Sequence, residues 1–114
     1  MAKWSKEYTI FKDTHRGYDF LIKYLKNPGV SYYCGYAKIP KEHKYNNIHY
    51  MEIPVKVHGD LSFSQDIDGE WWIGWDYAQK GDRNTELVNV IKDSCGVIMQ
   101  LLEADDSIGK KVNE

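Results

Sequence analysis

The segment Trp71–Asp82, with the sequence WWIGWDYAQKGD, holds the densest group of side chains suited to ligand binding in this chain. Side chains alternate along a β-strand, which gives this segment two occupied faces: Trp71, Ile73 and Trp75 on one, and Trp72, Gly74 and Asp76 on the other. The second face sets an indole beside a glycine and a carboxylate, which suits a flat ring with one polar anchor. The alternative is that both faces pack into the core or into an interface between copies.

Other polar and aromatic side chains are expected near this segment. Polar groups at strand ends or in the loops that follow are common in binding sites, because a rigid scaffold positions them there. A strand over 30–39 would also place Tyr36 on a face with hydroxyl groups and the Lys38 cation. We expect the tryptophan-rich segment and the His58 imidazole to line one solvent-accessible recess. The predicted ligand-binding residues are Tyr36, His43, His58, Trp72, Trp75, Asp76, Gln79 and Asp82.

Motifs of known enzyme classes are absent from the sequence. It has no phosphate-binding glycine-rich loop and no nucleophile elbow, and its four histidines lack the spacing of a zinc site. We therefore expect a binding protein without a metal or cofactor, which holds either a small, nucleotide-like ligand or a host protein. The alternative is a metal-assisted hydrolase in which His58 is the base and Asp76 and Asp82 orient it or bind the metal.

Composition limits the class of protein. The 114 residues suffice for one domain, and four Trp, nine Tyr and three Phe make up 14% of the chain. A net charge of −2 argues against a duplex nucleic-acid binder. No apolar run is long enough to span a membrane, and the two cysteines are far apart in the sequence, so we expect a cytoplasmic protein with free thiols.

The elements that would position these residues indicate an α+β fold, with an antiparallel sheet of four to five strands in two hairpins and one C-terminal amphipathic helix. The first hairpin joins strands over 17–25 and 30–39 through Lys26-Asn27-Pro28-Gly29. An edge strand is predicted over 53–58, the second hairpin joins 61–64 to 71–76, and the helix covers 85–103. The domain is expected to span residues 1–104, and 105–114 form a polar tail.

Three sequence blocks resemble a family of small proteins encoded by bacteriophages and prophages: Cys34–Pro40 (CGYAKIP) with His43 and Tyr45, Val57–Ser64 (VHGDLSFS), and Trp71–Asp82. In the family pattern a Gly stands at position 60 and a His at position 79, whereas this chain has Asp60 and Gln79. Trp75 and Tyr77 also depart from the pattern. Because Gln neither titrates nor binds zinc well, a metal or general-base role at position 79 is disfavoured.

The resemblance implies an origin more than a mechanism. By analogy, small phage proteins act by stoichiometric binding in the host cytoplasm, including inhibition of host defence by masking a protein or sequestering a nucleotide signal. It implies as partners a host defence protein or a small ligand. Whether the protein forms a homo-oligomer stays open.

Overall fold

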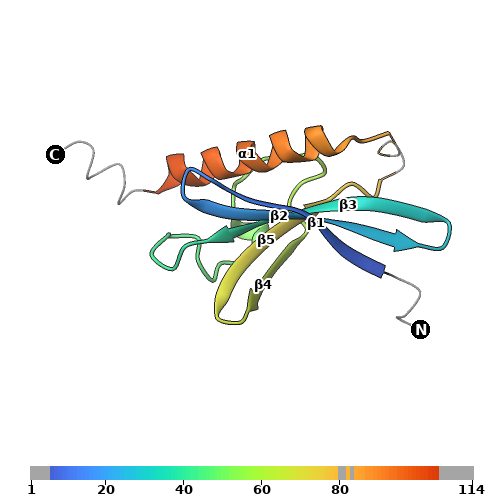
Figure 1. Cartoon of the computed structure of the whole chain (residues 1–114). Coiled ribbons are helices and arrows are strands. Elements are labelled where there is room, and N and C mark those ends of the chain that lie inside the picture. Colours follow the sequence, from blue (N-terminus) through green and yellow to red (C-terminus); the bar gives the residue numbers. More distant parts are fainter. Residues whose placement is uncertain (1–5, 80–81, 83, 106–114) are drawn as a thin grey trace.

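The computed structural model describes residues 6–79, 82 and 84–105, and within them an α+β fold. Five strands form one antiparallel sheet in the order β1-β2-β3-β5-β4, and a single described α-helix follows them. The strands are β1 (Lys6–His15), β2 (Tyr18–Asn27), β3 (Val30–Ile39), β4 (Phe63–Ile67) and β5 (Glu70–Asp76), and the helix is α1 (Leu87–Ala104). Figure 1 shows α1 lying across one face of the sheet, which confirms the predicted fold class.

The two predicted hairpins form, and their turns use the expected residues. β2 and β3 join at Pro28-Gly29, where Gly29 has φ +87°. β4 and β5 join at Asp68-Gly69, with φ +54° and +82°, which is the geometry that an Asp-Gly hairpin turn supplies. The predicted six-residue connection is therefore shorter, because β4 extends to Ile67 and β5 begins at Glu70.

The fifth strand is not the one that the sequence predicted. Residues 53–58 form no strand, although Ile53 and Val55 are buried as the alternation implied. The side-chain amide of Gln100 takes the place of a neighbouring strand: its oxygen accepts from Lys56 N–H at 2.7 Å, and its nitrogen donates to Lys56 C=O at 2.7 Å. Strand β1, which pairs with β2, occupies the fifth position at the sheet edge instead.

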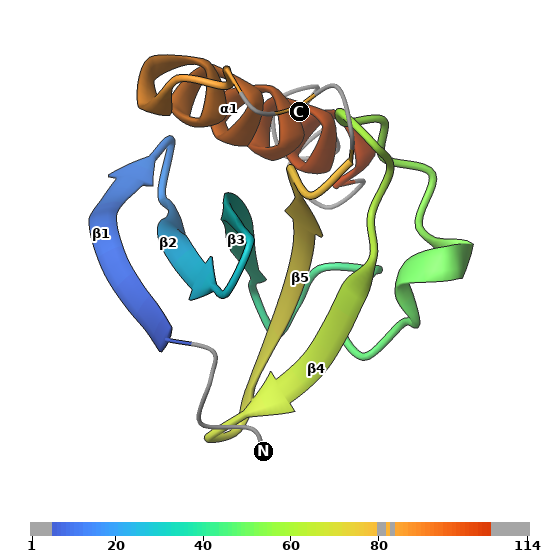
Figure 2. The same cartoon turned by 90° about the vertical axis from the view of Figure 1, so that its right-hand side faces the viewer.

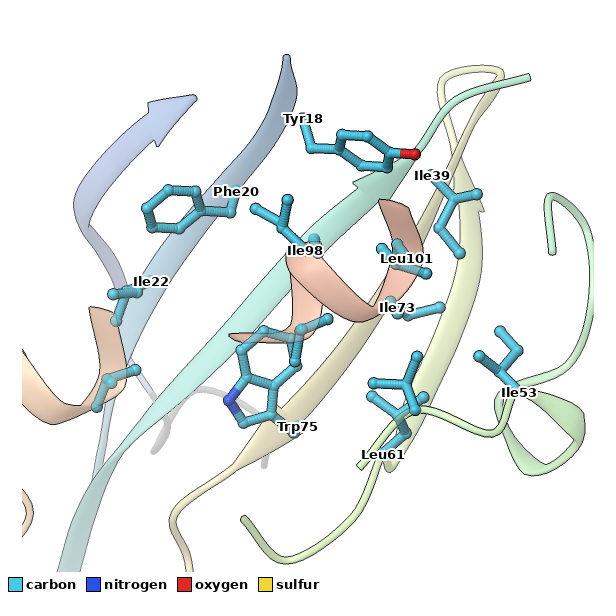
Figure 3. Packing of buried hydrophobic residues seen from close by; sticks show 14 of the residues in the cluster. Tyr18, Phe20, Ile22, Ile39, Ile53, Leu61, Ile73, Trp75, Ile98 and Leu101 are labelled. Carbon is cyan, nitrogen blue, oxygen red and sulfur yellow. The ribbon is translucent and has the colours of Figure 1, made fainter. Parts of the chain in front are cut away.

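The core lies between α1 and the face of the sheet that it covers. Phe20 and Ile22 of β2 and Ile73 and Trp75 of β5 point into it, with Ile98 and other helix residues opposite (Figure 3). The helix contacts β3 and β2. The helix begins at Leu87, so the predicted start at residue 85 is two residues early. The side chain of its N-cap residue, Glu86, makes no capping hydrogen bond.

The other face of the sheet is open in the part of the chain that the structure describes. Figure 2 shows α1 on one side of the twisted sheet and no described helix on the other. Alternation along the strands therefore separates a core face from an open face, as predicted for β3 and β5. Among the described residues, no helix combines the length and apolar character needed to cross a membrane.

Candidate functional site

A groove on the open face of the sheet brings together two of the predicted residues, Tyr36 and Trp72. We define the open-face groove by two adjoining pockets of about 340 and 440 Å³ that share Leu21 and Trp72. The first pocket is lined by side chains from all five strands: Glu7, Leu21, Lys23, Tyr36, Phe63, Gln65, Ile67 and Trp72. The second extends toward the turn between β1 and β2 and includes Lys38, Asp19 and Glu70. Trp72 thus lies where the two pockets meet.

Three aromatic rings form the apolar part of the groove. Tyr36 and Phe63 meet edge to face with their ring centroids 5.4 Å apart. The Tyr36 ring covers Gly74, where an added Cβ would lie only 2.9 Å from Tyr36 Cδ2. Gly74 therefore allows the Tyr36 ring to lie close against the sheet. This is the glycine that the sequence analysis set beside the Trp72 indole, and Tyr36 covers it.

Two lysines lie over these rings, and carboxylates hold both lysines in place. Lys23 Nζ is 5.4 Å from the Tyr36 ring centroid and 2.9 Å from Glu7. Lys38 Nζ is 5.8 Å from the Trp72 ring centroid and bridges Asp19 and Glu70, each at 3.0 Å. Hydrogen bonds to Asp19 and Glu70 raise the pKa of Lys38, and hydrogen bonds from Thr14 and then Lys38 lower the pKa of Asp19. The lysines are therefore fixed cations with resident counter-ions.

Two of the predicted residues have structural positions instead. Trp75 is 1% exposed, its ring packs on Gly35, and its Nε1 donates to Tyr77 Oη at 3.1 Å. His43 is also buried: Nδ1 accepts from Tyr45 N–H at 3.0 Å, which places the proton on Nε2, 2.7 Å from Leu101 C=O. Neither ring presents a face or a nitrogen to a ligand, so we leave both out of the candidate site.

His58, Asp82 and Gln79 form a separate cluster beyond the end of β5. His58 Nε2 lies 2.7 Å from Asp82 Oδ1, and Asp82 Oδ2 accepts from Gln79 N–H at 3.0 Å. The imidazole stacks on Tyr77 with ring centroids 5.0 Å apart, and its side chain is 45% exposed while that of Asp82 is buried. A buried carboxylate thus orients an exposed imidazole, an arrangement that can support acid–base chemistry.

Asp76 lies neither in the open-face groove nor in the cluster of His58, Asp82 and Gln79. Its carboxylate accepts from Ser62 Oγ at 3.1 Å and from Ala78 N–H at 3.2 Å, so it closes the end of the hairpin. Asp76 is paired in register with Cys34, and burial first and the Asp76 charge second raise the pKa of that thiol to about 12. Cys34 therefore stays a protonated, buried thiol.

The expectation of one common recess is wrong. Trp72 lines the groove on the open face, whereas Trp75 and Tyr77, on which His58 stacks, belong to the core under α1. The sheet itself separates the indole of Trp72 from the imidazole, because alternating residues of one strand point to opposite faces. Over the described ranges, no three His, Cys, Asp or Glu side chains lie close enough together to hold a metal ion.

Sequence reasoning missed several groove residues. Leu21 and Lys23 alternate with the core residues of the strand predicted over 17–25, so they lie on its open face. Their period-two spacing could have identified them as groove residues. Phe63 and Glu7 had weaker signals: Phe63 begins a short strand, and Glu7 lies in a strand that was not predicted. A further pocket, of about 460 Å³, lies beside the 3-10 helix Tyr50–Glu52 and contains none of the predicted residues.

No protein-family model, curated protein or solved structure matches the chain.

Proposed function

We propose that this protein is a stoichiometric binding protein that holds a small, flat, ring-bearing ligand in the open-face groove. The observation that carries the proposal is the groove itself, in which Tyr36, Phe63 and Trp72 from three neighbouring strands face one hollow. Each of its two pockets is within the range of about 300 to 1,000 Å³ that is typical of small-molecule sites. Aromatic rings in such a site offer large apolar contact area at low entropic cost.

The arrangement suits insertion of a ring between apolar walls. Trp72 is partly exposed at the junction of the two pockets, and Leu21 also lines both pockets. Gln65, which pairs with Trp72 in the β4–β5 register, supplies an amide donor and acceptor at the same position. A ring that stacks there can therefore be oriented by hydrogen bonds as well as held by apolar contact.

A thermal-shift screen tests the proposal. Nucleobases, nucleosides and nucleotides are added to the wild type, to Trp72→Ala and to Tyr8→Ala, a control that removes an exposed ring outside the groove. A ligand at 100 times its dissociation constant should stabilise the wild type by about 2.7 kcal/mol, or about 10 °C in melting temperature. The shift should persist in Tyr8→Ala and fall in Trp72→Ala. Equal shifts in both variants would reject the groove as the site.

The His58–Asp82 pair favours a second candidate, a hydrolase in which His58 acts as the general base. Asp82 would orient the imidazole, whereas Asp76 has the separate structural contacts described above. Turnover of phosphate and acyl esters by the wild type, lost in His58→Ala but retained in His49→Ala, would favour this candidate over binding alone. No turnover by the purified wild type would count against it.

The resemblance to phage proteins extends the binding proposal to a biological setting. For a phage-encoded protein, the bound molecule would come from the host cell, and binding would deplete it or mask a host defence protein that carries it. Mass spectrometry of small molecules that copurify with the folded wild type, but not with Trp72→Ala, is the direct test. Recovery of the same molecules with both proteins would contradict it.

A further inference from the structure

The charges of the open-face groove indicate which ligands it accepts. Resting on the proposed function, we propose that the groove takes an uncharged ring, such as a nucleobase or nucleoside, and discriminates against the phosphorylated form of the same molecule.

Two of the three lysines that line the groove, Lys23 and Lys38, already have a carboxylate to balance them. Lys23 is paired with Glu7 at 2.9 Å, and Lys38 is held between Asp19 and Glu70 at 3.0 Å each. A phosphate near Lys38 would lie beside both of these carboxylates, whose two negative charges outnumber the single charge of the ammonium.

The remaining charges do not create an anion site. Lys12 lines the second pocket only, and its positive charge acts on the Asp19 carboxylate, whose pKa it helps to lower. Counted together, the charged residues that line the two pockets are three lysines and four carboxylates, a sum of −1. The described α-helix lies against the opposite face of the sheet, so its N-terminus is not available to a phosphate in the groove.

This charge balance separates the groove from the open sheets that bind single-stranded nucleic acids. Such sheets also present aromatic rings for stacking, but they combine them with a positive surface that follows the phosphate backbone. Here Tyr36, Phe63 and Trp72 offer stacking faces while the ion pairs around them leave no surplus of positive charge. The rings therefore match the base of a nucleotide and not its phosphate.

Coulomb's law gives the size of the discrimination. At about 7 Å, in surroundings close to water, one surplus negative charge of the groove weakens the binding of a dianionic phosphate about eightfold. It weakens the binding of a monoanionic phosphate about threefold. We therefore expect each nucleoside to bind about five to ten times more tightly than its 5′-monophosphate at low ionic strength. Added salt should narrow this difference.

Isothermal titration of the full chain tests the inference with matched pairs: adenosine, guanosine, cytidine and uridine against their 5′-monophosphates, and a short single-stranded oligonucleotide. Two variants accompany the wild type. Glu70→Gln removes one groove carboxylate and should strengthen monophosphate binding relative to nucleoside binding, by about eightfold for the dianion and about threefold for the monoanion. Glu103→Gln removes an exposed carboxylate from α1 and should change neither affinity.

The outcomes separate this inference from the proposed function. Tighter binding of nucleosides, with the selective gain in Glu70→Gln, supports it. Tighter binding of monophosphates or of the oligonucleotide, abolished by Trp72→Ala, overturns the charge selection but retains the groove as the binding site. No heat with any of these probes, at concentrations where the protein stays folded, overturns both.

Discussion

Substitution of Gly35 by alanine, which adds a single methyl group, should strongly destabilise the fold. It lies in β3 directly opposite Trp75 of β5, and the Trp75 ring packs against it on the core side. A Cβ added at Gly35 would lie 2.5 Å from Trp75 Cε2 and 2.8 Å from Nε1. Comfortable contact between such atoms needs about 3.5 to 4.0 Å, so in Gly35→Ala the indole must move by about 1 Å.

The cost follows from how little room the indole has. Trp75 is 1% exposed, and overpacking a closed core in this way costs about 1 to 3 kcal/mol. Moving the ring also breaks the Nε1–H bond to Tyr77 Oη, a further cost of about 1 kcal/mol. The free energy of unfolding should therefore fall by about 2 to 4 kcal/mol. For a chain of 114 residues, this corresponds to a melting temperature about 8 to 16 °C lower.

Thermal unfolding followed by circular dichroism, with near-ultraviolet signals for the indoles, measures this effect. Gly96→Ala is the matched control, because nothing lies within 4 Å of a Cβ there and alanine favours a helix over glycine by about 1 kcal/mol. The same substitution should thus raise the melting temperature by about 4 °C in α1 and lower it in β3. A Gly35→Ala protein that melts within about 2 °C of the wild type would refute the packing argument.

Three further results are expected. Gly74→Ala should displace the Tyr36 ring and weaken ligand binding in the groove, with a smaller loss of stability than Gly35→Ala causes, because Tyr36 is only partly buried; calorimetry and thermal unfolding on one sample check both. A thiol reagent at pH 8 should modify Cys95 much faster than Cys34, whose pKa burial raises to about 12; equal rates would contradict the buried position. Burial also raises the pKa of Tyr18 to about 12. Since the folded state holds this proton more tightly, its contribution to stability is complete below about pH 10 and is lost as the pH rises toward 12, which denaturant titrations across that range measure.

The elements that sequence reasoning found are those with a clean local pattern. Strand β2 alternates buried and partly buried residues from Tyr18 to Lys23, and the Pro28-Gly29 and Asp68-Gly69 turns have residues that the backbone geometry requires. Strand β1 was missed because its register shifts between Thr9 and Phe11, so the alternation of the first half does not continue into the second.

Residues 53–58 show the opposite error, since they alternate without being a strand. Their burial pattern is real, but a strand also needs a neighbour for its backbone groups, and for Lys56 that neighbour is the side chain of Gln100. A contact between residues 44 positions apart depends on the tertiary fold and leaves no local signal.

The candidate site was predictable in its residue types and not in its grouping. Alternation assigned Tyr36 and Trp72 to matching faces of their strands, and register in the sheet then brought them into one groove. His58 lies outside any regular strand, so the sequence held no information on which face it would meet. The stack on Tyr77 places it on the core side, across the sheet from Trp72.

The groove and the core are connected through two neighbouring residue pairs of β3 and β5. Gly35 lies opposite Trp75 and Tyr36 lies opposite Gly74, so each strand gives one glycine and one aromatic ring. The Trp75 ring covers Gly35 on the core face and the Tyr36 ring covers Gly74 on the open face. Packing of a large ring over a glycine in the adjacent strand fixes the register of both. The register that buries Trp75 beneath α1 is therefore the same register that sets Tyr36 beside Trp72, and stability of the core and geometry of the groove depend on one strand pairing.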